Sequence, residues 1–210
     1  MRIYDLKKRK DLGSLVQHNG AITALQFYSR NHLLSASEDG TICIWRTRDW
    51  ECMATMKGHK GRVNGLCVHP SGKIAISVGK DKALRLWNLM TGRKASANKL
   101  GEGISAVLKV VLLIRIEAFD VKWNAAGDHY AILFDRKIVI YDMQATPILT
   151  IEHPVRIHCI RYFQHPTHGE TILAGLDDKL IRFYSPSNAK VLQEIKGHHA
   201  RYEYRFLWGC

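Results

Sequence analysis

Four aspartates, spaced 42 to 54 residues apart along this chain, are each followed six residues later by an aromatic residue, and this repeated spacing restricts the fold more than any other feature. In the first copy, Asp39-Gly40 predicts a hairpin turn. Ile42-Cys43-Ile44-Trp45 then reads as a short strand, because apolar runs between Asn, Ser, Asp and Gly are typical of strands joined by tight turns. The four pairs are Asp39 and Trp45, Asp81 and Trp87, Asp135 and Tyr141, and Asp178 and Tyr184.

A histidine opens several of the repeats, and three of these histidines lie at one distance from the preceding aromatic. His18, His59 and His198 each lie 14 residues after an aromatic residue, and the turn aspartates are spaced by 42, 54 and 43 residues. A period of 40 to 45 residues with a Gly-His start and an aromatic-Asp end is typical of WD repeats. We therefore predict an all-β fold, a WD-repeat β-propeller within a single domain. The predicted repeats span about residues 18–45, 59–87, 101–141 and 153–184.

Both ends of the sequence match only part of a repeat. Residues 1–6 resemble the end of a third strand, since Ile3-Tyr4-Asp5 matches Ile140-Tyr141-Asp142, and residues 197–210 open a repeat that has no turn aspartate. We therefore expect an incomplete propeller, with about four full repeats and partial blades at 1–6 and 197–210. Two explanations stay open: the sequence is a fragment or an incomplete gene product, or another chain supplies the missing blades.

The third repeat is 12 residues longer than the first, with an aspartate spacing of 54 against 42. Its pattern of apolar residues places the surplus near 101–114, which includes the apolar run Ser105–Ile114. Surface loops are usually polar, so this insert is unusual. It is a docking segment or an extra edge strand, a retained non-coding stretch, or a buried strand that shifts the register.

The repeated polar residues suggest a structural role. In WD repeats, the histidine, a strand serine, the turn aspartate and the closing aromatic form a buried hydrogen-bonded chain that staples each blade, and a buried carboxylate needs such partners. A catalytic set would not recur once per blade, so we predict no catalytic residue and a protein that is not an enzyme. The predicted staple residues are His18, Ser35, Asp39 and Trp45, then His59, Ser77, Asp81 and Trp87, with Asp135, Tyr141, Asp178 and Tyr184 at the corresponding later positions.

Composition and motifs limit the classes of ligand. The five cysteines show no C-x-x-C spacing, and no phosphate-binding loop, G-x-S-x-G or H-E-x-x-H motif occurs, so we expect no metal, no cofactor and no small-molecule substrate. His165-Pro-Thr-His168 offers two imidazoles without a third ligand and reads as a solvated turn. The apolar run Val107–Ile116 is about half the roughly 20 residues of a spanning helix, so no membrane contact is expected.

A formal net charge of +12 and a pI of about 9.6 favour acidic partners, either RNA or an acidic protein face. Basic residues cluster at Arg2 with Lys7–Lys10, at Arg46 and Arg48, and in two loops at equivalent positions of the repeat. These clusters are either solvated loops or contacts to RNA or acidic protein, and the interleaved aromatics of a base-stacking platform are absent. The two loops predict a partner-binding rim of Lys57, Lys60, Arg62, Lys196 and Arg201.

The first two repeats also carry a family resemblance. His18–Phe27, Leu34–Trp45 and His69–Lys73 resemble the PAK-interacting WD-repeat proteins and their fungal relatives, and the likeness is looser over Phe119–Lys196. The resemblance implies a nuclear and nucleolar scaffold for maturation of the large ribosomal subunit. It also implies protein partners, namely pre-ribosomal assembly factors and a PAK-family kinase whose activation the protein restrains. The family's Lys-rich tail and final blades have no counterpart in this sequence.

Overall fold

The computed structural model describes residues 1–90, 93–94 and 116–196. The apolar insert near 101–114, the C-terminal segment 197–210 and the rim residue Arg201 lie outside this description. Every regular element in the described part is a β-strand, which confirms the predicted all-β class. Over these same residues, no helix is long and apolar enough to cross a membrane.

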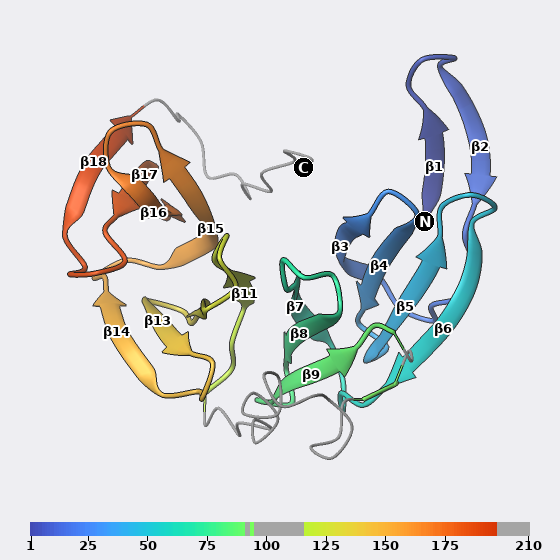
Figure 1. The fold of residues 1–210 in the computed structure, drawn as a ribbon, viewed down its shortest axis with the longest axis horizontal. Helices are drawn as coiled ribbons and strands as arrows, with labels where there is room; N and C mark the ends of the chain where they lie inside the picture. The colour runs from blue at the N-terminus through green and yellow to red at the C-terminus, as the bar shows by residue number, and fades with distance from the viewer. Residues whose placement is uncertain (91–92, 95–115, 197–210) are drawn as a thin grey trace.

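Four antiparallel sheets of four strands each form the blades, which follow one another in chain order along an open arc (Figure 1). Each blade is a simple meander, so neighbours in sequence are neighbours in the sheet. The first blade contains β3 (Ile22–Ser29), β4 (His32–Ser37), β5 (Thr41–Arg46) and β6 (Glu51–Lys57), and the second contains β7 (Val63–Val68), β8 (Ile74–Gly79), β9 (Leu84–Asn88) and β10 (Arg93–Lys94).

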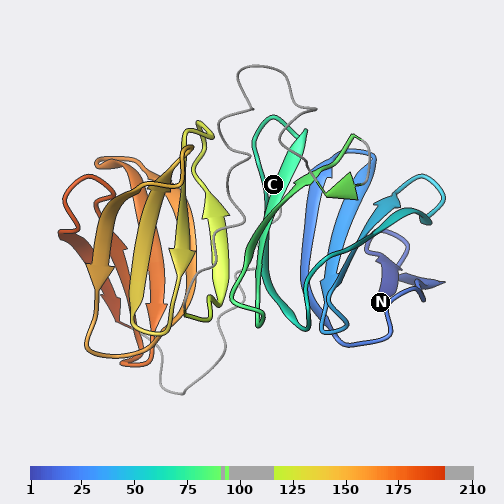
Figure 2. The same cartoon turned by 90° about the horizontal axis from the view of Figure 1, so that it is seen from below.

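The third and fourth blades repeat this arrangement on the other side of the arc. The third contains β11 (Asp120–Trp123), β12 (His129–Leu133), β13 (Lys137–Asp142) and β14 (Pro147–Glu152), and the fourth contains β15 (Ile157–His165), β16 (Gly169–Leu176), β17 (Leu180–Tyr184) and β18 (Val191–Lys196). The first strands β3, β7, β11 and β15 contact one another in turn and line the inside of the arc. Figure 2 shows the blades side by side, as a WD-repeat propeller stacks them.

A two-stranded hairpin precedes the first blade, formed by β1 (Arg2–Asp5) and β2 (Lys10–Ser14). Its pairing shifts register between Ile3 and Tyr4, just as the third and fourth strands of the first, third and fourth blades shift register beside their closing aromatic. Arg9 in its turn has a positive φ of 49°, as Trp50 has (59°) in the turn of the first blade. The hairpin therefore has the local geometry of the third and fourth strands of a blade.

Apolar side chains fill the spaces between successive blades, which explains the alternating pattern of each strand. Leu34 and Ile42 of the first blade pack with Val63, Leu66 and Trp87 of the second in one buried cluster. Similar clusters join the second blade to the third and the third to the fourth. The core is thus a row of interfaces between sheets, because a single blade is too thin to bury its own apolar faces.

Polar contacts also cross from one blade to the next along the inner strands. The side-chain carbonyl of Gln26 on β3 accepts the N–H of Val68 on β7 at 3.1 Å. The Sγ of Cys67 accepts the N–H of Trp123 on β11 at 3.3 Å. These contacts satisfy N–H groups on the strand edge that no sheet partner covers.

Candidate interaction site

The second blade contains a hydrogen-bonded chain of four side chains. The Nε1–H of Trp87 donates to Ser77 Oγ at 2.8 Å, and Ser77 Oγ lies 2.7 Å from Nε2 of His59. The Nδ1 of His59 lies 2.8 Å from Oδ1 of Asp81. Because a neutral imidazole has one N–H, the carboxylate favours that proton on Nδ1, and Nε2 accepts from Ser77. The chain therefore runs in one direction, from the indole to the carboxylate.

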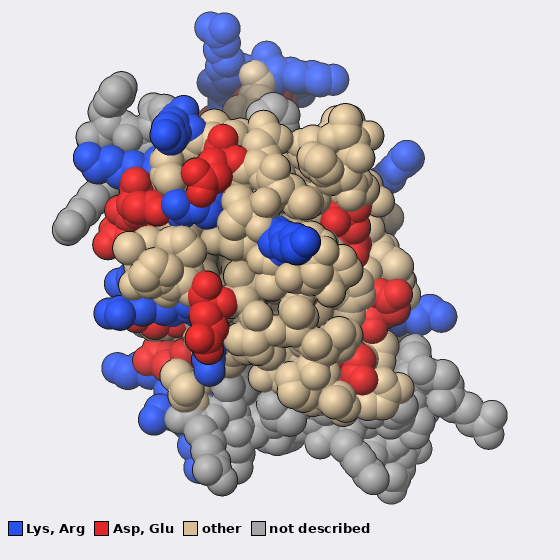
Figure 3. All heavy atoms as spheres, turned by 90° about the vertical axis from the view of Figure 1, so that its left-hand side faces the viewer, with Lys and Arg blue, Asp and Glu red and all other residues tan. Residues whose placement is uncertain are grey.

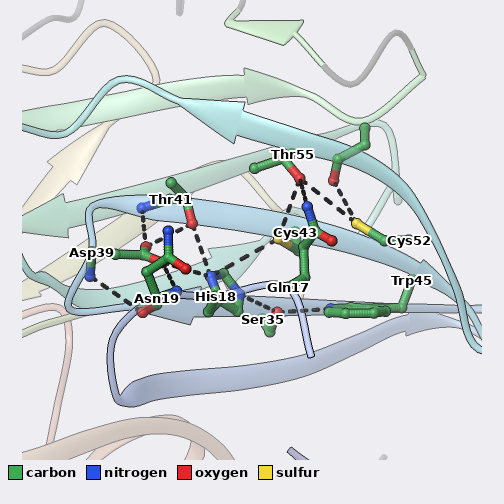
Figure 4. A network of polar contacts seen from close by, with 12 residues as sticks. Gln17, His18, Asn19, Ser35, Asp39, Thr41, Cys43, Trp45, Cys52 and Thr55 are labelled. Atoms are coloured by element: carbon green, nitrogen blue, oxygen red, sulfur yellow. Dashed lines mark hydrogen bonds and ion pairs between the residues drawn. The ribbon is translucent and has the colours of Figure 1, made fainter. Parts of the chain in front are cut away.

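The first blade contains a similar chain with one additional member (Figure 4). Trp45 Nε1–H donates to Ser35 Oγ at 2.8 Å, and Ser35 Oγ lies 2.7 Å from His18 Nε2. The Nδ1 of His18 lies 2.8 Å from Thr41 Oγ1, and the Thr41 hydroxyl donates to Asp39 Oδ1 at 2.6 Å. The Thr41 hydroxyl therefore bridges the imidazole of His18 and the carboxylate of Asp39. The Oδ2 of Asp39 is 3.4 Å from Nδ1 of His18.

The third and fourth blades do not form this chain, which differs from the prediction for their turn aspartates and closing tyrosines. The strand pairing gives the reason: Ile132 and Ala174 occupy the positions of Ser35 and Ser77, two residues beyond the partner of the closing aromatic. Neither residue has a hydroxyl that could join the closing aromatic to a histidine. The buried Tyr184 hydroxyl accordingly has no hydrogen-bond partner among the described residues.

Ion pairs replace the chain around the later turn aspartates. Asp135 accepts from Nε of Arg156 at 3.1 Å, and Asp178 accepts from Nη1 of Arg182 at 2.6 Å. Tyr141 stacks on Tyr130, with ring centroids 5.7 Å apart. The predicted staple residues of these two blades are thus in place along the strands, but they have other partners.

Hydrogen bonds keep the first two turn aspartates charged. Burial raises the pKa of Asp39, but bonds from the Thr41 hydroxyl and N–H and from the Asn19 N–H outweigh it and lower the pKa from 3.8 to about 2. The pKa of Asp81 is lowered too, because its bonds to His59 and to a backbone N–H outweigh the opposing effect of burial. These carboxylates are structural anions that fix the loops around them.

The end of β6 and the loop between β6 and β7 carry three of the predicted rim residues, Lys57, Lys60 and Arg62. The Lys60 N–H donates to Asp81 Oδ2 at 3.1 Å, so the chain in the second blade also fixes this loop. Arg62 Nη1 donates to Glu38 Oε1 at 2.7 Å, which joins the loop to the β4–β5 turn of the first blade. The loop is therefore held from both blades.

Two lysines that the sequence reasoning missed, Lys80 and Lys82, lie in the neighbouring β8–β9 turn, where the Lys80 N–H donates to the Arg62 carbonyl at 2.8 Å. The Lys-Asp-Lys sequence around the turn aspartate Asp81 could have predicted that both lysines lie in this turn. We call Lys57, Lys60, Lys80 and Lys82 the rim lysines. All four are exposed, and the described part of the chain provides no ion pair for their side chains.

Lys196 does not join this cluster. It is the last residue of β18, opposite Leu180, and so occupies in the fourth blade the position that Lys57 occupies opposite Thr41 in the first. The second and third blades lie between them (Figure 1). On the face of the molecule at the left of Figure 1, acidic and basic side chains are interspersed with uncharged surface (Figure 3). The rim lysines are thus a local basic surface on the first two blades.

The remaining chemistry of the site is limited. Over residues 1–90, 93–94 and 116–196, no three His, Cys, Asp or Glu side chains gather in a way that could hold a metal ion. Burial raises the pKa of the Cys43 thiol to about 12 and that of Cys159 to about 11, which keeps both thiols protonated. What the rim lysines offer is a positive surface on a rigid frame, which suits binding of an acidic partner.

Comparison with known proteins identifies the repeats. Residues 9–46 and 50–88 match the family described as "WD domain, G-beta repeat". The chain is 43% identical over 202 residues to p21-activated protein kinase-interacting protein 1-like of Gallus gallus, which covers 96% of this chain and 50% of that relative. It is 39% identical over 203 residues to p21-activated protein kinase-interacting protein 1 of Homo sapiens, covering 96% and 47%.

A fungal relative is similar over the same region. Protein MAK11 of Saccharomyces cerevisiae is 36% identical over 204 residues, covering 88% of this chain and 47% of the relative. The chain thus spans about half the length of the curated relatives it matches. With its repeats, its four meander blades and these relatives, the chain belongs to the WD-repeat proteins related to p21-activated protein kinase-interacting protein 1 and MAK11.

Proposed function

We propose that this chain acts as a non-enzymatic WD-repeat scaffold in large ribosomal subunit biogenesis, where it supports pre-rRNA processing in the nucleus and nucleolus. Its second role is to bind a PAK-family kinase and restrain its activation. The family supports both roles, and the names of the vertebrate relatives support the kinase as a partner. The observation on this chain that supports the proposal is the basic surface of the rim lysines. Hydrogen bonds to Asp81 and between the neighbouring loops hold this surface in place.

The chemistry of the rim favours an acidic protein segment as the partner. Lys60 and Arg62 lie on a loop whose backbone is bonded to Asp81 and to the neighbouring turn, so ordering the loop on binding costs little entropy. Charged groups at such a rim contribute mainly to specificity and to the association rate. We therefore expect the kinase to present Asp and Glu side chains to the rim.

The kinase role is tested by charge reversal at the rim. The variant Lys57→Glu/Lys60→Glu/Lys80→Glu removes three exposed cations without touching the buried chain of the second blade. We expect its affinity for the regulatory segment of a PAK-family kinase, measured by titration calorimetry, to fall at least about tenfold. Restraint of kinase activation should weaken in parallel in a phosphorylation assay.

A matched control reverses three exposed cations elsewhere. Arg30, Lys73 and Lys190 are exposed, and their side chains make no ion pair within the part of the chain that the structure describes. They lie in turns at the other end of the strands from the rim. Arg30→Glu/Lys73→Glu/Lys190→Glu should leave kinase affinity within about twofold, since exposed charges away from the interface contribute little. Equal losses in both variants would refute a role for the rim.

The ribosomal role is tested in the cell. Depleting the protein should cause unprocessed large-subunit pre-rRNA to accumulate, and re-expressing the natural protein should restore processing. The tagged protein should sediment with pre-ribosomal particles and concentrate in the nucleolus. Normal pre-rRNA after depletion would overturn this role and leave the kinase role standing.

A further inference from the structure

Two thiols of the first blade face the same hydroxyl group. Cys43 on β5 is fully buried, and Cys52 on β6 is half-buried. The Sγ of Cys43 lies 3.6 Å from Thr55 Oγ1, and the Sγ of Cys52 lies 3.7 Å from the same oxygen (Figure 4). All three side chains belong to the β5–β6 hairpin, so their arrangement is local to one pair of strands.

The strand pairing explains why the two sulfurs approach each other. Cys43 is the partner of Thr55, and Cys52 is the partner of Trp45. The register shift beside Trp45 adds one residue to β6, which brings Cys52 and Thr55 to the same face although they are three residues apart. The Cys52 thiol donates to the Ala54 carbonyl at 3.6 Å and so reaches along β6 toward Cys43. Because β6 is the edge strand of its sheet, it can adjust to a sulfur–sulfur bond of about 2.05 Å.

The two thiols differ in their reactivity toward an oxidant. Burial raises the pKa of Cys43 to about 12 against the effect of the Thr55 hydrogen bond, and the neighbouring Cys52 thiol contributes to the rise. Cys43 therefore stays protonated and is a poor nucleophile toward a peroxide. Cys52 lies on the edge strand of the blade and is partly in contact with solvent. Oxidation should therefore begin at Cys52.

We propose that hydrogen peroxide converts the thiols of Cys43 and Cys52 into a disulfide bond. In the first step, the Cys52 sulfur attacks one peroxide oxygen and the O–O bond breaks. The departing hydroxide takes the Cys52 thiol proton, which gives water and a sulfenic acid at Cys52. In the second step, the Cys43 sulfur attacks the Cys52 sulfur, the S–S bond forms, and the S–O bond breaks to release a second water. The two thiols are oxidised and the peroxide is reduced, independently of any kinase or ribosomal role.

The Thr55 hydroxyl is placed to assist the second step. Cys43 must lose its proton as its sulfur attacks, and the hydroxide that leaves Cys52 must gain one. Because Thr55 Oγ1 contacts both sulfurs, its hydroxyl can accept the proton from Cys43 and donate its own toward Cys52. The bond would form beside the buried chain of the first blade, since Cys43 Sγ lies 3.9 Å from His18 Nδ1.

The test treats the whole chain with a small molar excess of hydrogen peroxide, blocks the remaining thiols with an alkylating reagent and digests the protein with trypsin. Trypsin places the two cysteines in separate peptides, 31–46 and 49–57. A disulfide therefore appears in mass spectrometry as one linked species that has lost the two thiol hydrogens. We expect this species in the natural protein, and dithiothreitol should release both peptides.

Three variants separate the steps. Cys43→Ala should stop the reaction at the sulfenic acid of Cys52, which dimedone traps, whereas Cys52→Ala should leave Cys43 unoxidised. Thr55→Val keeps the shape of the side chain without its hydroxyl, so disulfide formation should slow at least about tenfold while sulfenic acid accumulates. The matched control is Cys159→Ala, because Cys159 is also half-buried but lies in the fourth blade. It should form the disulfide within about twofold of the natural rate.

Two results would overturn the proposal. The first is the absence of the linked species from the natural protein at a peroxide excess that oxidises Cys52. The second is oxidation of Cys43 in the Cys52→Ala variant at the natural rate, which would mean that Cys43 reacts without its neighbour. A Thr55→Val variant that forms the disulfide at the natural rate would overturn the role of the hydroxyl. Circular dichroism checks the fold of each variant, and the first result needs only the natural protein.

Discussion

Replacing Ser77 by alanine tests the buried chain of the second blade at its centre. Ser77 Oγ accepts from Trp87 Nε1–H and donates to His59 Nε2, and the exposed fractions of the three residues are 0%, 0% and 8%. The substitution removes the hydroxyl that accepts from the buried indole N–H of Trp87 and donates to the imidazole of His59. Because each of these two lost hydrogen bonds costs about 1 to 3 kcal/mol, we expect Ser77→Ala to lower the free energy of unfolding by about 2 to 6 kcal/mol.

Urea unfolding, followed by circular dichroism, measures this loss. With an m-value of about 2 kcal/mol/M, the urea midpoint should fall by about 1 to 3 M. Ser187→Ala is the matched control, because Ser187 is exposed and its hydroxyl contacts only the neighbouring Ser185 hydroxyl, at 2.8 Å. The control should change the free energy of unfolding by less than about 0.5 kcal/mol.

A double-mutant cycle with Trp87→Phe separates the hydrogen bond from packing. If the indole N–H and Ser77 act together, the double variant should be more stable than the sum of the two losses predicts, by about 1 kcal/mol or more. Additive losses, or a Ser77→Ala variant within about 0.5 kcal/mol of the natural protein, would refute the reasoning. In that case the chain would be a geometric coincidence of the repeat.

Three further predictions concern other parts of the first three blades. Because folding lowers the pKa of Asp39 from 3.8 to about 2, the stability that its charged form provides is present above pH 4 and is lost as pH falls toward 2. Asp39→Asn should flatten this part of the pH profile of the thermal midpoint. An unchanged profile would contradict a stabilising role for the charged Asp39 carboxylate. Gly58→Ala would place a Cβ 2.8 Å from the Trp87 ring, so we expect a loss of about 1 to 3 kcal/mol in urea unfolding, and a neutral result would contradict the close packing. His69 Nε2 lies 2.9 Å from the Gly127 carbonyl, which links the second and third blades, so His69→Ala should lower the thermal midpoint by about 2 to 8 °C, and no change would show that the link is dispensable.

The spacing of aspartate and aromatic was enough to predict the fold class, because both features depend on local geometry. The Asp39-Gly40 turn illustrates this: Gly40 has a φ of 81°, a conformation that glycine adopts without strain. The same reasoning placed Arg2–Asp5 as a third strand, and the register shift beside Tyr4 agrees with that assignment. Turn and strand patterns of this kind lie within a few consecutive residues, so they can be recognised in the sequence alone.

The details of the site depended on residues that the repeat pattern does not require. The hydrogen-bonded chain stops after the second blade because Ile132 and Ala174 replace the serine, and for the fourth blade the residue four before the turn aspartate would have predicted this. Thr41 was missed because a threonine at a strand start usually reads as a β-former. Contacts between blades, such as His69 with Gly127, are 58 residues apart in sequence and leave no local signal.

Two backbone N–H groups on the inner strands have their acceptor in the preceding blade. Gln26 supplies an acceptor to Val68, and Cys67 supplies one to Trp123, so in both cases the earlier blade satisfies an N–H of the later one. On the ribosome, chain segments emerge and fold from the N-terminus onward. Each of these blades would therefore meet an acceptor already in position as it leaves the exit tunnel, and assembly can proceed by templated addition in the order of synthesis.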